Sequence, residues 1–166
     1  VKLCELGPPG DNPMYIAWGP QFTQFYNDAY RPILGAKHPT ALGQASPECF
    51  AEIWDFIGPM FERVLREGVS TTLVDQILPL NRNGYLEECY FTFSYSAIHD
   101  ETGGVGGVLV TCIETTERII GERRLRTLSE LAAGTVGAKD AAEVADRIAR
   151  TLSANPQGFP FAVPYW

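Results

Sequence analysis

The middle of the chain contains two segments with the composition of β-strands, and the second of them runs directly into a charged helical segment. Residues 85–98 are rich in aromatic side chains, and residues 106–113 form a second apolar run. The loop between them, residues 99–104, is polar and ends in two adjacent glycines, which is typical of a hairpin. The sequence therefore predicts an antiparallel pair of strands whose last strand continues into a helix at residues 114–118.

Two further short strands are predicted near the start of the chain. Residues 14–18 and 22–26 are apolar segments separated by Gly19-Pro20, a strong turn signal. Asn27 is in a position suited to a helix N-cap, and Gly35 is typical of a residue that ends a helix. Residues 28–34 are therefore predicted to form one brief helix.

A long covering helix is predicted from Ser46 to Gly68. Ser46, followed by a proline and an acid, has the signature of a helix start. Apolar side chains then recur at three- and four-residue spacing, at Phe50, Ile53, Trp54, Ile57, Phe61, Val64 and Leu65. Pro59 removes a backbone donor inside this pattern, which predicts a kink or a break near Gly58-Pro59.

These segments together favour an α+β fold. Residues 69–80 alternate loosely, and Asn83-Gly84 predicts a tight hairpin into the next strand. No repeated strand-helix-strand crossover is present to build a parallel sheet. We therefore expect a five-stranded antiparallel sheet, covered by helices on one face, with a C-terminal helical extension.

The order of elements over residues 14–120 resembles a PAS sensory domain. The segments that carry the resemblance are Phe25-Tyr26-Asn27-Asp28-Ala29-Tyr30, Asn81-Arg82-Asn83-Gly84 and Ile113-Glu114-Thr115-Thr116. The last of these conservatively replaces the Asp-Ile-Thr-like junction at which such domains pass into a signalling helix. The resemblance implies that the last strand lies next to the first in the middle of the sheet.

The resemblance also implies where ligands and signals act. It places a ligand pocket between the long helix and the sheet, with candidate wall residues Phe25, Trp54, Ile57, Phe61, Phe91, Phe93 and Tyr95. It places signal transmission at Glu114, Thr115, Thr116 and Arg118. The aromatic side chains of the fourth strand either stack on a flat ligand or simply fill the core.

The segment after the last strand is predicted to be an amphipathic helix with a narrow apolar seam. Residues 119–133 place Leu125, Leu128, Leu131 and Ala132 among charged side chains. Two copies would pair through this seam as a short parallel coiled coil and make a homodimer. The alternative is a helix that lies back on its own sheet.

The last part of the chain resembles the first helix and first strand of a GAF domain. Residues 139–152 form a second amphipathic pattern with Asp140 as cap, and residues 155–166 form an apolar, strand-like end.

We therefore expect an N-terminal extension at 1–13, a PAS domain at 14–118, a linker helix at 119–136 and an incomplete GAF-like part at 137–166. Such an array implies a bacterial sensor histidine kinase as the parent protein, with a downstream kinase or GAF domain on the same polypeptide and a role in phosphorelay.

Charge and hydropathy exclude several classes of partner. Thirteen Lys and Arg against twenty Asp and Glu give a net charge of -7, which disfavours nucleic acid and anionic membrane surfaces. No apolar run has the length of a membrane span, and residues 1–10 lack the pattern of a signal peptide. These features favour a cytoplasmic location.

The search for catalytic and cofactor motifs is negative. The sequence has no phosphate-binding loop, no His-Glu-x-x-His and no nucleophile elbow, so no catalytic residue is assigned and the chain is not expected to be an enzyme. His38 and His99 fall in predicted loops, which disfavours haem. The cysteine motif of light-sensing flavin proteins is missing, which disfavours a cysteine-flavin adduct.

The cysteines give no metal site. Cys4, Cys49, Cys89 and Cys112 are scattered, without a Cys-x-x-Cys pair, so free thiols are expected. A cross-strand disulfide between Cys89 and Cys112 would need a register that brings them together.

Two functional hypotheses follow. In the first, the chain is a regulatory input module in which a small ligand or a partner alters the pocket and the C-terminal helix relays the change. In the second, it is a constitutive dimerisation scaffold with a filled core and no ligand. A third, less favoured class is a small enzyme that uses the same sheet.

Overall fold

The computed structural model describes residues 12–154. Most of the expected N-terminal extension and the whole apolar end at 155–166 lie outside the described residues, as does Cys4. The chain divides into two compact units, Val1–Thr116 and Glu117–Trp166, which are described separately below.

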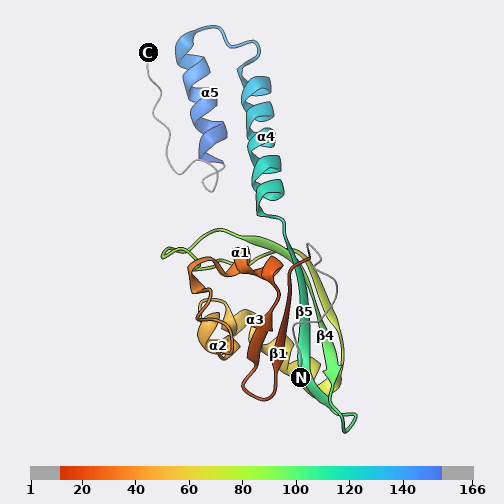
Figure 1. The fold of residues 1–166 in the computed structure, drawn as a ribbon. Coiled ribbons are helices and arrows are strands. Elements are labelled where there is room, and N and C mark those ends of the chain that lie inside the picture. Colours follow the sequence, from red (N-terminus) through yellow and green to blue (C-terminus); the bar gives the residue numbers. More distant parts are fainter. Residues whose placement is uncertain (1–11, 155–166) are drawn as a thin grey trace. The chain divides into compact units, whose positions relative to one another are not determined.

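The first unit is built on a five-stranded antiparallel sheet with the order β2-β1-β5-β4-β3 (Figure 1). The strands are β1 (Met14–Trp18), β2 (Thr23–Tyr26), β3 (Thr71–Ile77), β4 (Tyr90–His99) and β5 (Val105–Glu114). The last strand, β5, lies between β1 and β4 in the middle of the sheet. The α+β fold class and the central position of the last strand are therefore confirmed.

Short helices and one longer helix cover one face of this sheet (Figure 1). They are the 3-10 turn η2 (Asp28–Tyr30), α1 (Arg31–Leu34), the 3-10 turn η3 (Gly35–Lys37), α2 (Ser46–Cys49) and α3 (Trp54–Glu67). Gly68 ends α3 as predicted, because its left-handed backbone, with φ of 68°, allows its N–H to bond to Val64 O at 2.8 Å.

The prediction of one long helical segment from Ser46, with a kink or a break near Gly58-Pro59, was wrong. The helical segment breaks at residues 50–53, and α3 then runs without interruption through Pro59. Ser46 is not a cap, because its buried side chain donates to Phe22 O at 2.6 Å and accepts from Tyr15 OH at 3.0 Å. These bonds fasten α2 to Tyr15 on β1 and to Phe22, the residue just before β2.

Two local predictions in the loops were also wrong. Asn27 forms no side-chain cap; its Oδ1 accepts from Met14 N at 3.0 Å and so secures the start of β1. Asn83-Gly84 does not form a tight hairpin, because Leu80 and Glu87 exchange backbone hydrogen bonds across a wider loop. As a result β4 begins at Tyr90 and not at residue 85.

The core lies between the inner face of the sheet and the helices. It gathers alternate side chains of β1, β4 and β5 with one face of α3. Cys89 and Cys112 are both buried and free. In the β4–β5 register Cys112 stands opposite Phe93, so the cross-strand disulfide considered above is not formed.

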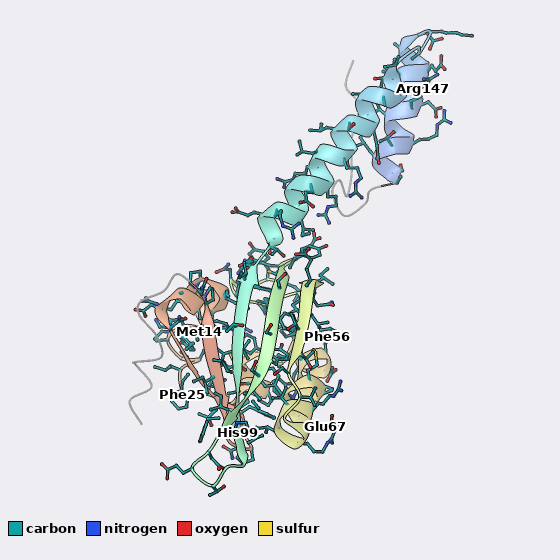
Figure 2. All side chains as sticks on the ribbon, turned by 90° about the vertical axis from the view of Figure 1, so that its right-hand side faces the viewer. Met14, Phe25, Phe56, Glu67, His99 and Arg147 are labelled. Atoms are coloured by element: carbon teal, nitrogen blue, oxygen red, sulfur yellow. The ribbon has the colours of Figure 1, made fainter. Side chains whose placement is uncertain are left out.

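The second unit contains α4 (Thr116–Thr135, counted from the last residue of the first unit) and α5 (Ala141–Ser153). Asp140 caps α5 as predicted, with its Oδ1 accepting from Glu143 N at 2.8 Å. Arg147, labelled in Figure 2, donates from Nη1 to Gly134 O at 2.8 Å and so ties α5 to the end of α4. Among the described residues no helix is long and apolar enough to cross a membrane.

Candidate functional site

A small, mainly apolar cavity lies between the sheet and the covering helices. Its volume is about 40 Å³, which is room for about three water molecules or one small organic molecule of similar bulk. The lining residues are Tyr15, Tyr30, Ile33, Phe50, Ile53, Ile57, Phe61, Leu78, Leu80, Phe91, Phe93, Tyr95, Val110 and Cys112.

The structure brings together most of the residues that the sequence nominated for the pocket wall. Those around the cavity are Ile57, Phe61, Phe91, Phe93 and Tyr95. Phe25 is not among them: it follows the buried Gln24 on β2, and the alternation of the strand turns it to the other face (Figure 2). Trp54 is half-buried, and its ring packs on Phe22 and Phe61 with centroids 5.5 Å apart in each pair.

Several lining residues were not anticipated. Tyr15 on β1 and Val110 and Cys112 on β5 share the inner face of the sheet, and strand alternation alone could have found them. Phe50 and Ile53 reach the cavity because the chain leaves helical geometry between α2 and α3. No sequence signal marked that break.

The polar groups of the cavity wall are uncharged. Burial raises the pKa of Tyr15, Tyr30 and Tyr95, and it raises the pKa of Cys112 to about 12, so all four stay protonated at neutral pH. Among the described residues that line the cavity there is no Asp, Glu, Lys, Arg or His. Within residues 12–154 no cluster of His, Cys, Asp and Glu could hold a metal ion.

An ion-pair network stands at the point where β5 ends and α4 begins. Arg82 makes a bidentate contact with Glu114, Nη1 to Oε2 at 2.8 Å and Nη2 to Oε1 at 2.9 Å. Its Nε also donates to Glu87 Oε2 at 3.0 Å. Two parallel bonds from one guanidinium fix both distance and orientation, so the network holds the β3–β4 loop on the end of β5.

Two threonines complete this junction. Thr116 Oγ1 donates to Glu114 Oε1 at 2.8 Å and accepts from Tyr90 N at 2.9 Å. Thr115 N donates to Tyr90 O at 2.8 Å, which extends the strand pairing beyond the last residue of β5. Of the residues nominated for signal transmission, Glu114, Thr115 and Thr116 therefore meet here, whereas Arg118 pairs with Glu122 one turn along α4 at 3.0 Å.

The junction is directly connected to the cavity wall and to the helical layer. Leu80 and Cys112 line the cavity, and each stands two residues before a member of the Arg82–Glu114 pair. On the other side of the loop, Arg82 O accepts from Ala36 N at 2.7 Å. The cavity wall and the Arg82–Glu114 pair are thus two residues apart along the β3–β4 loop and two residues apart along β5.

The Arg82 contact alters the ionisation of Glu114. Burial on its own would raise the pKa of this carboxyl, but the hydrogen bonds from Arg82 and Thr116 outweigh it and hold the pKa below its ordinary value. The carboxylate therefore stabilises the fold above the unfolded-state pKa of about 4.3, and this contribution is lost as the pH falls through the lower folded-state pKa.

We expect acid to destabilise the wild-type chain more than its Glu114→Gln variant. Between about pH 6 and about pH 3 the wild-type free energy of unfolding should fall more steeply, because only the wild type must protonate a carboxylate that the fold stabilises. Urea unfolding at a series of pH values measures how steeply the free energy of unfolding of each protein changes with pH. If the free energy of unfolding fell equally steeply with pH in both proteins, ionised Glu114 would not stabilise the fold.

The residues of the predicted dimer seam lie along α4. Leu125 and Leu128 are 68% and 57% exposed, Leu131 is half-buried and Ala132 is exposed. Leu125 and Leu128 are thus large apolar side chains that no other described residue covers.

Comparison with known proteins identifies the fold independently. The family model described as "PAS fold" matches residues 19–119. The comparison with curated proteins found no matching sequence.

Solved structures agree with the family model. The PAS domain from Bordetella pertussis BvgS matches with a TM-score of 0.50 and 22% identity, over 72% of this chain and 88% of that chain. A phage VqmA-DPO complex matches with a TM-score of 0.50 and 16% identity, over 93% of this chain and 77% of that chain. An RNA-binding Light-Oxygen-Voltage receptor matches with a TM-score of 0.54 and 18% identity, over 75% of this chain but 34% of that chain. At these identities the similarity shows the fold alone.

Proposed function

The chain belongs to the PAS fold family, and on this basis we propose that it is a sensory input module of a signal-transduction protein. In this proposal a small ligand or a partner changes the cavity, and the change passes along β5 into α4. The observation that carries the proposal is the position of β5, which contributes Val110 and Cys112 to the cavity wall and Glu114 to the Arg82 network.

The proposed relay needs two arrangements of the junction with different affinities for the ligand. The bidentate Arg82–Glu114 contact suits this role because it is directional: a small shift of either partner breaks at least one of its two bonds. Thr116, the first residue of α4, bonds to the same carboxylate, so the start of the helix follows the position of Glu114.

The wider context is part of the same proposal. We infer a bacterial sensor histidine kinase as the parent protein, a GAF-like domain begun by α5, phosphorelay as the process and a cytoplasmic location. The chain itself is proposed to have no catalytic activity. These inferences rest on the order of the elements and on the family.

The alternative is a constitutive dimerisation scaffold. The modest cavity volume of about 40 Å³ and the tight aromatic packing around Phe61 favour this alternative. A scaffold needs no difference in ligand affinity between two states, whereas a sensor does.

Native mass spectrometry of the freshly purified chain, compared with its denatured mass, separates the two functions. The sensor proposal predicts additional noncovalent mass at a fixed ratio to the chain. A mass equal to that of the bare chain, unchanged after incubation with candidate metabolites, would favour the scaffold.

We expect the double substitution Leu125→Asp and Leu128→Asp to convert a homodimer into monomers. Two carboxylates placed in the apolar seam would have to be buried without partners if the helices stayed paired. Sedimentation equilibrium measures the mass directly. Val136→Asp is the matched control, because this exposed residue lies beyond the end of α4, and it should leave the dimer intact. An unchanged mass for the double variant would place the dimer contact elsewhere.

A further inference from the structure

The segment that contains α2 forms part of the cavity wall. This lid segment, residues 44–53, contributes Phe50 and Ile53 to the lining. It begins after Gly43, which has a left-handed backbone with φ of 81°, and it ends at the break before Trp54. Both ends of the lid segment are therefore points outside regular helix, where the backbone can change direction.

A strained residue lies against the lid segment. Phe22, just before β2, combines a bulky side chain with a left-handed backbone, with φ of 53°, which is unfavourable for such a residue. Its carbonyl oxygen accepts from the backbone N of Ser46 at 3.0 Å and from the Ser46 hydroxyl at 2.6 Å. Two hydrogen bonds from the lid segment therefore end on the carbonyl group of the strained residue.

A buried amide also lies against the lid segment. Gln24 on β2 is fully buried, and among residues 12–154 neither its side-chain nitrogen nor its side-chain oxygen has a hydrogen-bond partner. Its polar neighbour is the thiol of Cys49 on α2, and a thiol is only a weak hydrogen-bonding group. Gln24 does not line the cavity, so a water molecule there would not satisfy the amide. A buried amide without partners lowers the stability of the closed arrangement.

From these features we propose that the lid segment is a gate, which opens as a unit and connects the cavity with solvent. Opening relieves both costs, because it frees the carbonyl group of Phe22 and admits water to the amide of Gln24. Such an opening is local unfolding, which requires less free energy than unfolding of the whole domain. The gate needs no ligand in order to open, so it holds or fails independently of the proposed function.

The contacts that fasten the closed lid segment lie near both of its ends. Near its start Ser46 bonds to Phe22 and Tyr15, and near its end the Nζ of Lys37 donates to the backbone oxygen of Cys49. Removing a fastening contact should therefore favour the open gate. Removing one of the two unfavourable features should favour the closed gate.

Thiol labelling of the full chain measures the opening. Cys49 lies on the lid segment, Cys112 lines the cavity, and Cys89 is fully buried but belongs to neither. The chain is incubated with methyl methanethiosulfonate at several urea concentrations below the unfolding transition, and peptide mass spectrometry gives the labelling rate of these three cysteines. Cys49 and Cys112 should be labelled faster than Cys89 and with a weaker dependence on urea, because gate opening exposes little surface.

Two variants test why the gate opens. Gln24→Met keeps much of the side-chain shape but removes the amide, so it should slow the labelling of Cys49 and Cys112 by about fivefold or more. Ser46→Ala removes the side-chain bonds of the lid segment and should speed both reactions by about fivefold or more. Gln76→Met is the matched control, because Gln76 lies on β3 at the opposite edge of the sheet from β2, and it should leave both rates unchanged.

Three results would overturn the gate. Equal rates with equal urea dependence for all three cysteines would show that only unfolding of the whole domain exposes them. Labelling of Cys49 without Cys112 would show that α2 moves without opening the cavity. Unchanged or faster labelling of Cys49 in Gln24→Met would show that the buried amide does not oppose the closed lid segment. In each case native mass spectrometry still decides the proposed function by itself.

Discussion

Replacing Phe61 with Ala should lower the free energy of unfolding by about 3 to 5 kcal/mol. Phe61 is fully buried on α3, and its ring contacts those of Tyr15, Phe22, Trp54 and Tyr95 at centroid distances of 4.6 to 6.1 Å. The substitution removes the ring that joins the helix to both β1 and β4, and the neighbours are too constrained to close the void. Urea unfolding measures the loss.

Phe56→Ala is the matched control for this experiment. Phe56 lies on the same helix but is 44% exposed (Figure 2), so its removal should cost much less than that of Phe61. Equal losses for the two variants would contradict the assignment of Phe61 to the centre of the core.

Replacing Arg82 with Met should cost about 2 to 3 kcal/mol and disturb the start of α4. Met keeps most of the aliphatic volume but leaves Glu87 and Glu114 without the guanidinium that both carboxylates contact. The side chains of Arg82 and Glu87 are largely buried, so water compensates only in part. Urea unfolding measures the loss in stability, and amide shifts at residues 114–118 report on the junction.

Arg63→Met provides the comparison. Arg63 also pairs with a carboxylate, Glu67 Oε2 at 3.0 Å, but both side chains are well exposed on α3. Its loss should cost less than about 0.5 kcal/mol. If Arg82→Met lowered the free energy of unfolding no more than Arg63→Met does, the ion pairs of Arg82 would not contribute to stability as proposed.

The strands could be predicted well because their signals are local. Residues 14–18 were assigned with the bounds that β1 has in the structure, and the order of β4, β5 and α4 follows from the apolar runs and the glycine-bearing loop. The break between α2 and α3 could not be predicted, because Phe50 and Ile53 continue the helical spacing although the chain there is not helical. Just before the break, Ser46 bonds to Tyr15 and Phe22, which are distant in the sequence, and contacts of this kind leave no trace in the local pattern.

The candidate site was predictable only in part for a related reason. Aromatic density on the fourth strand pointed to Phe91, Phe93 and Tyr95, which do line the cavity. The ion pair between Arg82 and Glu114 joins residues 32 positions apart. Nothing in the sequence distinguishes these two residues from the other charged residues as a pair. Likewise, the hydrogen bond between Tyr15 and Ser46 joins residues 31 positions apart and is decided by packing in three dimensions.

Amide hydrogen exchange across the junction tests the central claim most directly. The full chain is measured by mass spectrometry with and without the small molecule that copurifies with it, or the metabolite that native mass spectrometry shows to bind, in the wild type and in Arg82→Met. The account predicts that filling the cavity changes exchange in peptides covering residues 110–118 of the wild type, and that this change beyond Glu114 is lost in Arg82→Met. A response confined to the helices and β4, with residues 114–118 unaffected in the wild type, would contradict the proposed relay from the cavity to α4.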